Sequence, residues 1–264
     1  SENPNFVREL SKNKIIFIGP SEKAIISMGD KIKSKTIAEK ASVNVVPGFI
    51  GEINDIKHAK EIAKKICFPV IIKASAGGGG KGMRIVNSEE EVEEAFLRAS
   101  SEAKNSFGDE RLFVEKYLIE PRHIEIQIIA DNYGNIVSLG ERECSIQRRN
   151  QKVIEEAPSS FLDETLRRDM STQAIMLAKE VEYSSAGTVE FIVDKNKNFY
   201  FLEMNTRLQV EHPVTEMITG LDLVHEMINV ANNKTLSFSQ KDIKLNGWAF
   251  ESRIYAEDPY KGFL

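Results

Sequence analysis

The 264-residue sequence predicts an α+β fold in which a small lobe precedes a larger lobe with mixed sheets. Three observations support this prediction. Helix and strand patterns alternate in the first half, strand patterns separated by polar turns dominate the second half, and a run of glycines lies between two of the strands. With 41% hydrophobic residues, the chain has enough apolar side chains for a core of this size.

The small lobe is expected near residues 46–117. Short apolar runs that stop at glycine or proline indicate buried strands, and apolar residues recurring every three or four positions indicate helices. Ser88 with Glu91 forms a capping box at the start of the helix after the glycine run. In chain order, we expect a strand at 14–20, helices at 30–41 and 55–66, strands at 69–74 and 83–86, a helix from 88, and a strand or linker at 113–118.

The larger lobe is expected from residue 118 onwards. Its strands come in pairs joined by polar turns at 131–135 and 194–198, a spacing typical of hairpins. Asp222 is expected to cap the last helix. In chain order, we expect strands at 123–130 and 136–141, a helix at 166–181, strands at 188–193 and 199–204, a helix from 222 to 230, and a final strand at 247–255.

Composition excludes several classes of function. The net charge of −5 disfavours binding of duplex nucleic acid, and no apolar stretch approaches the ~18–20 residues that a membrane span needs. The first residues lack the pattern of a secretory signal. Two cysteines, Cys67 and Cys144, favour a reducing compartment over a disulfide scaffold, and the four histidines lack metal-ligand spacing. We therefore expect no nucleic-acid or membrane partner.

Residues 77–82 read Gly-Gly-Gly-Gly-Lys-Gly between two predicted strands. A dinucleotide-binding fold needs a helix after such a loop, and a P-loop needs glycine where Ser75 stands and serine or threonine where Gly82 stands. What remains is a glycine hairpin whose free amides can close over phosphate. A surface hairpin without a ligand is the alternative, although each glycine costs about 0.5–1 kcal/mol in backbone entropy.

Two lysines can reach the same phosphates. Lys73 ends the strand that enters the glycine run. Lys31 follows a helix N-cap, where the helix dipole disfavours a cation and a phosphate would relieve the mismatch. For Lys31 alone, a solvated side chain is an equally good interpretation.

A second hairpin carries carboxylates. A turn centred near 196–197 places Glu190 opposite Glu203, and Asn205 shares a face with Glu203. Two facing carboxylates repel each other unless a cation lies between them, and these oxygens suit Mg²⁺ or Mn²⁺. Beyond this hairpin, Arg207, Gln209 and Glu211 continue the alternation of polar side chains. The alternative is an exposed polar face.

Charged residues beyond this hairpin suggest an anion site. Arg207 and Arg253 can clamp a carboxylate or bicarbonate, although a structural ion pair is the better interpretation for either one alone. Glu211 can act as a general base if it is buried beside these charges. Cys144 has no oriented histidine base and is expected in the core.

Together, the glycine hairpin and the carboxylate hairpin resemble the ATP-grasp fold. Over essentially the whole chain, the sequence is similar to the biotin carboxylase family, and within it to the propionyl-CoA type. The segments that carry the family resemblance are 28–31, 69–74, 115–118, 121–125, 147–149, 203–207 and 209–216, and those that carry the subtype are 143–152 and 255–261.

The resemblance implies ATP- and bicarbonate-dependent carboxylation of biotin through carboxyphosphate. Glu211 would deprotonate bicarbonate, and Arg253 would stabilise the biotin enolate. The catalytic residues would be Lys152, Arg207, Glu211 and Arg253, and the residues that bind bicarbonate and biotin would be Lys152, Arg207, Gln209, Val210 and Arg253. The residues that hold Mg²⁺ or Mn²⁺ would be Glu190, Glu203 and Asn205. The residues that bind ATP would be Lys31, Lys73, Gly79, Gly80, Glu115, Lys116, Leu118, His123, Gln147, Asn150, Glu190 and Glu203.

The resemblance also implies a central piece of a larger subunit. Residues 1–45 would end an N-terminal nucleotide-fold domain and its linker helix, 46–117 would form the lid, and 118–264 would form the C-lobe with the start of a C-terminal domain. An Ala-Met-Lys-Met biotin-acceptor motif is absent from the sequence, so biotin would be carried on another domain. Implied partners are bicarbonate, that biotinyl domain and a carboxyltransferase (β) subunit, in a bacterial cytoplasm or a mitochondrial matrix.

One departure and two alternatives accompany the resemblance. Asn150 stands where acetyl-CoA-type members of the family have histidine, which favours the propionyl-CoA type. The chain could bind MgATP without turnover. It could also be another bicarbonate-activating ATP-grasp ligase, such as carbamoyl-phosphate synthase.

Overall fold

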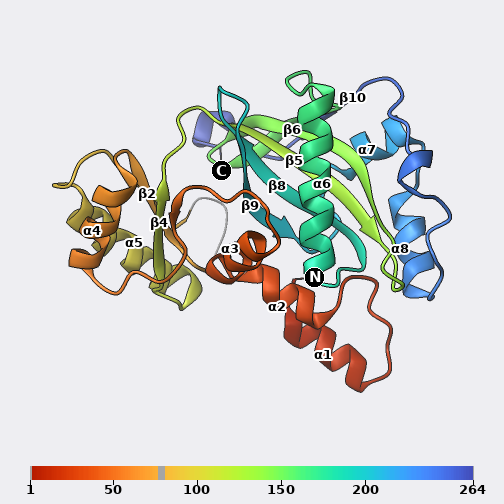
Figure 1. The fold of residues 1–264 in the computed structure, drawn as a ribbon, viewed down its shortest axis with the longest axis horizontal. Coiled ribbons are helices and arrows are strands. Elements are labelled where there is room, and N and C mark those ends of the chain that lie inside the picture. Colours follow the sequence, from red (N-terminus) through yellow and green to blue (C-terminus); the bar gives the residue numbers. More distant parts are fainter. Residues whose placement is uncertain (1, 77–80, 264) are drawn as a thin grey trace.

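The computed structural model describes residues 2–76 and 81–263. Three helices open the chain, and two sheet-containing lobes follow, a small one on the left of Figure 1 and a larger one on the right. The opening helices are α1 (Pro4–Lys12), α2 (Glu22–Gly29) and α3 (Lys31–Lys40). None of the helices in these ranges combines the length and the apolar character needed to cross a bilayer.

The small lobe is a four-stranded antiparallel sheet packed against two helices. Alanines recur at helical spacing on the inner faces of both helices, so the helices approach the sheet closely. In the order β1-β4-β2-β3, the strands are β1 (Gly48–Phe49), β4 (Leu112–Lys116), β2 (Val70–Ala74) and β3 (Met83–Val86), and the helices are α4 (Ile56–Ile66) and α5 (Val92–Phe107).

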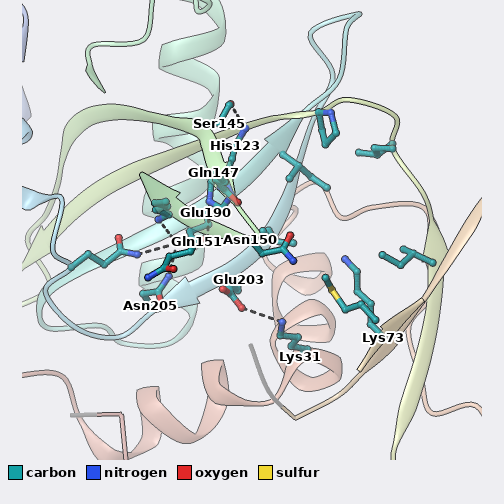
Figure 2. Close-up of a pocket in the computed structure, with 18 of the residues that line it drawn as sticks. Lys31, Lys73, His123, Ser145, Gln147, Asn150, Gln151, Glu190, Glu203 and Asn205 are labelled. Atoms are coloured by element: carbon teal, nitrogen blue, oxygen red, sulfur yellow. Dashed lines mark hydrogen bonds and ion pairs between the residues drawn. The ribbon is translucent and has the colours of Figure 1, made fainter. Parts of the chain in front are cut away.

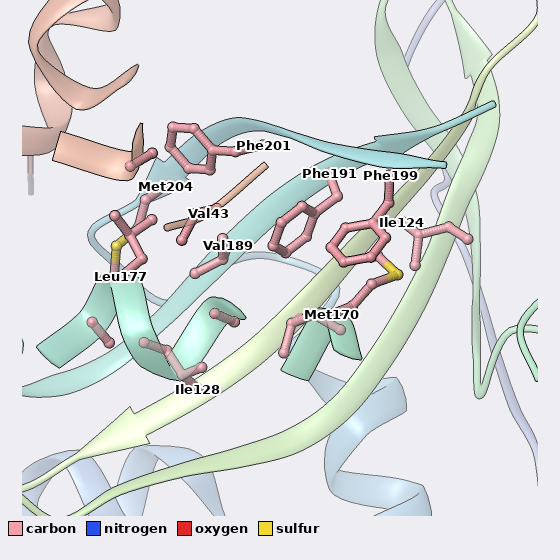
Figure 3. Packing of buried hydrophobic residues seen from close by; sticks show 14 of the residues in the cluster. Val43, Ile124, Ile128, Met170, Leu177, Val189, Phe191, Phe199, Phe201 and Met204 are labelled. Atoms are coloured by element: carbon pink, nitrogen blue, oxygen red, sulfur yellow. The ribbon is translucent and has the colours of Figure 1, made fainter. Parts of the chain in front are cut away.

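The larger lobe is a six-stranded sheet with helices on both faces (Figure 1). One face packs on α6 (Glu164–Glu180), and Met170, Phe191 and Phe201 lie in this core (Figure 3). The other face meets α7 (His212–Thr219) and α8 (Leu223–Ala231). In spatial order, the strands are β10 (Ala249–Ser252), β7 (Gln151–Ala157), β6 (Ile136–Arg148), β5 (Arg122–Ala130), β8 (Ser185–Val193) and β9 (Phe199–Asn205).

The structure confirms the α+β class and most of the predicted elements, but the sheets are antiparallel rather than mixed. Among the described residues, one parallel bridge, between Val45 and Phe201, is the exception. Short turns join β5 to β6 and β8 to β9, and such turns connect antiparallel strands only. Two 3₁₀ turns, Gln240–Asp242 and Pro259–Lys261, complete the elements described.

Two predictions in the first half are wrong. Residues 14–20 form no strand; Ile15 and Ile16 are more than half exposed, and within the described ranges no strand lies beside them to pair with. The capping box is absent as well, because α5 begins at Val92 and the Glu91 carboxylate accepts from the Asn87 N–H instead.

Strand β7 and helices α1, α2 and α7 were not predicted. The turn that leads into β7 contains no glycine, although Arg149 and Asn150 take positive φ angles of 52° and 63° there. Asparagine tolerates this left-handed conformation better than most residues do, which is the only turn signal that the sequence offers here.

Candidate functional site

A pocket of about 490 Å³ lies between the small and the larger lobe (Figure 2). Every predicted site residue within the described ranges lines it, from helix α3, strands β2 and β4 to β9, and the segments around 118, 207–211 and 253. These residues are Lys31, Lys73, Glu115, Lys116, Leu118, His123, Gln147, Asn150, Lys152, Glu190, Glu203, Asn205, Arg207, Gln209, Val210, Glu211 and Arg253. Gly79 and Gly80 lie outside the described residues.

A cluster of lysines forms one wall of the pocket. Lys35 and Lys73 both donate to the carboxylate of Glu115, and all three side chains are buried. One carboxylate thus serves two ammonium groups, and Lys31 adds a third positive charge nearby. Burial, reinforced by Lys31, lowers the pKa of Lys73 to about 7. A polyanion such as a triphosphate would supply the missing negative charge.

Glu115 and Lys116, two of the residues expected to bind ATP, have side chains that are engaged within the protein. The Glu115 carboxylate holds the two buried lysines, so it is not free to meet a base. Lys116 also turns away, since its ammonium donates to the carbonyls of Cys67 and Phe68, both at 3.0 Å. At the opposite wall, Gln147 Nε2 lies 3.1 Å from His123 Nδ1.

Glu190 and Glu203 face each other across the β8–β9 ladder, as the sequence predicted. Glu190 is 4% exposed. Although burial alone would raise its pKa, the neighbouring His123 and Lys152 hold that pKa well below its usual range. Its Oε1 accepts from Lys152 Nζ (2.9 Å), Gln209 Nε2 (2.9 Å) and Asn205 Nδ2 (2.8 Å), and its Oε2 lies 2.8 Å from His123 Nε2.

The donor set at this hairpin fits a divalent cation. Glu203 points into the pocket with Lys31 Nζ at 3.3 Å, and its side chain is 31% exposed (Figure 2). Carboxylate and amide oxygens of Glu190, Glu203 and Asn205 are the ligands that Mg²⁺ and Mn²⁺ prefer. His123 and Glu125 also lie within ligand distance of Glu190. The ammonium of Lys152 contacts both Glu125 and Glu190, so that position already holds a positive charge.

The far end of the pocket gathers alternating charges. Lys152 Nζ donates to Glu211 Oε1 at 2.6 Å, and Arg253 Nη2 lies 2.8 Å from Glu211 Oε2. Arg253 also pairs with the buried Glu155. Burial would raise the pKa of Glu211, but Lys152 and Arg142 lower it below the usual value. An ionised, 2% exposed carboxylate between two cations can accept a proton from a bound anion.

The row at 207, 209 and 211 does not continue as a strand. β9 ends at Asn205 and α7 begins at His212, with Pro213 in its first turn, so the chain leaves the sheet between them. Arg207 Nε donates to Glu2 Oε2 at 2.8 Å, and Val210 is 60% exposed at the pocket mouth. Both arginines are thus held in ion pairs, as the alternative interpretation expected, while still lining the pocket.

Sequence reasoning missed three charged residues behind the site: Lys35, Glu125 and Arg142. Glu125 and Arg142 are fully buried, although β5 alternates polar and apolar residues as a half-exposed strand would. The available signal was that the β5–β6 hairpin places an acidic and a basic residue opposite each other, since Glu125 pairs in register with Arg142.

Residues 30–239 match the family model described as "Carbamoyl-phosphate synthase L chain, ATP binding domain". The chain is 52% identical to a biotin carboxylase from Campylobacter jejuni, solved as a β,γ-ATP complex, with a TM-score of 0.95 over 98% of this chain and 58% of that one. The chain belongs to the biotin carboxylase family. It has the ATP-grasp fold of that family, as the resemblance predicted.

Other relatives of this biotin carboxylase domain are longer carboxylase chains. It is 62% identical to the propionyl-CoA carboxylase alpha chain of Ruegeria pomeroyi, covering 100% of this chain and 39% of that protein. It is also 62% identical to the mitochondrial propionyl-CoA carboxylase alpha chain of Homo sapiens, covering 36% of it. The chain thus spans less than two fifths of the length of these two curated relatives.

A second solved structure was determined with ligands. The biotin carboxylase domain dimer of 2-oxoglutarate carboxylase from Hydrogenobacter thermophilus, in complex with MgADP, ADP and bicarbonate, superposes with a TM-score of 0.96 at 52% identity. The match covers 99% of this chain and 58% of that chain.

Proposed function

We propose that this chain carries out the ATP- and bicarbonate-dependent carboxylation of biotin, as the biotin carboxylase part of an acyl-CoA carboxylase. The observation that carries this proposal is one pocket with three adjoining groups of side chains. Lys31 and Lys73 suit a polyphosphate, a carboxylate pair suits a metal, and Lys152, Glu211 and Arg253 suit a small anion.

The nucleotide would lie between the lobes. Lys31 and Lys73 would hold its phosphates and the glycines at 79–80 would close over them, while the backbone of 115–118 would meet the adenine and His123 the ribose. Gln147 and Asn150 would complete this end of the site.

In this proposal 46–117 is the lid, 118–264 is the C-lobe with the start of a further domain, and 1–45 ends a nucleotide-fold domain with its linker helix.

Glu190, Glu203 and Asn205 would hold Mg²⁺ or Mn²⁺. A bound ion there supplies positive charge that neutralises the phosphates during transfer. The chain's own contribution is to keep Glu190 ionised through Lys152 and His123, so that a ligand carboxylate needs no deprotonation on binding.

Bicarbonate would be held by Lys152, Arg207, Gln209 and Val210. Glu211 would take the bicarbonate proton while a bicarbonate oxygen attacks the γ-phosphorus of ATP, which breaks the bond to ADP and forms carboxyphosphate. Carboxyphosphate would then split into CO₂ and phosphate beside biotin, and the phosphate would accept the N1′ proton. Arg253 would stabilise the resulting enolate charge.

We propose propionyl-CoA as the acyl substrate of the complete enzyme, because the relatives of that name match this chain along its length. The proposed partners are a biotinyl domain and a carboxyltransferase subunit. The compartment would be a bacterial cytoplasm or a mitochondrial matrix, since relatives of both kinds match.

A second candidate function is binding of MgATP without turnover. It is supported by the buried Lys73 and the facing Glu190 and Glu203, which suit a nucleotide and its metal whether or not the anion end of the pocket takes part. Another bicarbonate-activating ligase, of the carbamoyl-phosphate synthase kind, is a third candidate, because the matching family model carries that description.

Release of ADP separates these candidates. It should be measured with MgATP alone, with added bicarbonate, and with bicarbonate plus free biotin. Stimulation by biotin is expected from the proposed function. Bicarbonate-dependent release that ignores biotin and responds to ammonia would indicate the third candidate, and nucleotide binding without release would indicate the second.

A further inference from the structure

A guanidinium lies completely enclosed behind the anion end of the pocket. Arg142, on β6, has no exposed surface, and its Nε donates to Glu125 Oε1 at 2.6 Å. A guanidinium has five N–H donors, and each finds an acceptor here. The other four acceptors are Gln127 Oε1 (2.6 Å), Thr215 Oγ1 (2.9 Å), Thr188 Oγ1 (3.1 Å) and Gln209 Oε1 (3.0 Å).

The contact with Gln209 decides how its amide is oriented. Arginine has donors only, so the oxygen of the Gln209 amide must face Arg142. The Nε2 group then points the other way, where it donates to Glu190 Oε1 at 2.9 Å and lines the pocket. An N–H donor is the end of the amide that an anion needs, and a flipped amide would set two donors against each other at Arg142.

A second connection runs from Arg142 to Lys152. Glu125 accepts from Arg142 through one oxygen and from Lys152 through the other. Lys152 in turn donates to Glu211 at 2.6 Å. Because Glu125 has no exposed surface and both of its oxygens are occupied, its position, and through it that of the Lys152 ammonium, depends on Arg142.

Arg142 also joins the element that follows Glu211 to the sheet. Its Nη1 donates to Thr215, in the α7 helix that begins one residue after Glu211. The same guanidinium therefore reaches strands β5 and β8, the 206–211 segment and α7. Enclosing this many charged groups is costly, and an apolar cluster would hold the same elements together at least as well.

We propose that Arg142 is a positioning residue for bicarbonate: without touching the anion, it aims the Gln209 amide N–H and the Lys152 ammonium at it. This inference rests on the proposed function and adds to it a residue outside the pocket lining.

The test compares Arg142→Lys with Arg167→Lys in the complete protein. Arg167 is a matched control, because it pairs with the buried Glu141, the residue before Arg142 in β6, and anchors α6 rather than the pocket. KM values for bicarbonate and MgATP come from steady-state ADP release. Bicarbonate affinity is measured separately by titration calorimetry with MgADP present, and melting temperature reports the fold.

Lysine keeps the charge opposite Glu125 but cannot reach all five acceptors. We expect Arg142→Lys to raise the bicarbonate KM by about tenfold or more, with the MgATP KM changed less than about twofold. Arg167→Lys should lower the melting temperature and leave both KM values within about twofold. In a Gln209→Ala background, adding Arg142→Lys should raise the bicarbonate KM by clearly less than it does alone, because the two changes act through one contact.

Each possible result either supports or overturns the role proposed for Arg142. If the unmodified protein neither binds bicarbonate nor shows bicarbonate-dependent release, the proposed function fails and this inference fails with it. If it does both, and Arg142→Lys leaves the bicarbonate KM unchanged or shifts both KM values together, this inference alone is wrong. Should Arg142→Lys not fold, Gln127→Met removes one anchor of the guanidinium. It should raise the bicarbonate KM by about threefold, and no change would overturn the proposal.

Discussion

Glu190 and Glu203 lie directly opposite each other on β8 and β9, yet their surroundings differ. Glu190 is buried between Lys152 and His123. Glu203 is 31% exposed at its side chain and has Lys31 as its neighbouring cation, at 3.3 Å. Facing carboxylates repel each other, so a cation entering this hairpin would find its open coordination positions at Glu203.

Glu203→Gln should therefore weaken Mg²⁺-dependent nucleotide binding. Removing a charged ligand should cost at least about tenfold in metal affinity, the lower end of what even indirect metal contacts contribute. The check is the nucleotide dissociation constant measured over a series of Mg²⁺ concentrations. Glu180→Gln, the same change at the far end of α6, should leave that constant unchanged. Full retention of Mg²⁺ dependence in Glu203→Gln would remove the proposed metal site.

Arg253→Ala should separate bicarbonate-dependent ADP release from its stimulation by biotin. Arg253 is proposed to act on biotin, so bicarbonate-dependent ADP release should persist while its stimulation by biotin is lost. The variant should also be less stable, because the buried Glu155 loses its partner. ADP release with and without biotin, in the complete protein, is the measurement. An unchanged biotin response would contradict the assigned role.

Nucleotide binding should take up a proton at Lys73. Its pKa of about 7 means that the ammonium is partly deprotonated in the free protein at neutral pH. A bound polyphosphate favours the charged form, so we expect uptake of about half a proton per nucleotide at pH 7 and nearly one at pH 8. Affinity should fall as pH rises above 7. Calorimetry in buffers of different ionisation enthalpy measures the uptake.

Two comparisons test the assignment to Lys73. Lys73→Met should abolish the uptake, whereas Lys64→Met, on the outer face of α4, should preserve it. The pH dependence of stability gives an independent check on the direction of the Lys73 pKa shift. The unfolded chain holds this proton up to a pKa near 10.5, so between pH 7 and 10.5 the Lys73 contribution to the free energy of unfolding should increase with pH. Uptake that survives in Lys73→Met would assign the proton elsewhere.

Gly187→Ala should destabilise the larger lobe. A Cβ at this β8 position would lie 2.5 Å from the Tyr183 hydroxyl, which is buried and donates to the Ala186 carbonyl. Overpacking of this kind costs about 1–3 kcal/mol in the free energy of unfolding. Chemical denaturation measures it, and Gly29→Ala, where a Cβ would meet nothing within 4 Å, is the control. Equal stability of the two variants would show that Tyr183 can move aside.

The second hairpin shows what sequence can predict about a site. Near the polar turn at 194–198, Val193 pairs with Phe199 and Phe191 with Phe201, and a β-bulge beside Phe191 then shifts the register by one residue, so that Glu190 lies opposite Glu203. Although the bulge could not be predicted, the pair itself could be predicted from local pattern, because the two residues are close in the chain. The same was true of α3, where the Asp30 cap accepts from the Lys33 N–H.

Elsewhere the pattern misled. Residues 14–20 have the composition of a buried strand, but their isoleucines are exposed, because burial depends on what packs beside them. Strand β5 has the alternation of a half-exposed strand, but its polar face is buried, because Arg142 bonds to Glu125 and Gln127 there and also to Gln209 and Thr215, which follow β9 in the chain.

The sequence by itself determined the fold class, the family and the charged residues that line the pocket, since these depend on short motifs and local periodicity. Only the tertiary structure decided which acidic and polar side chains pair with which basic ones. Lys35 and Lys73 meet on Glu115, and Arg142 reaches Gln209 from 67 residues away. Such pairs depend on which strands become neighbours and which charges lose contact with water, and no local pattern encodes either.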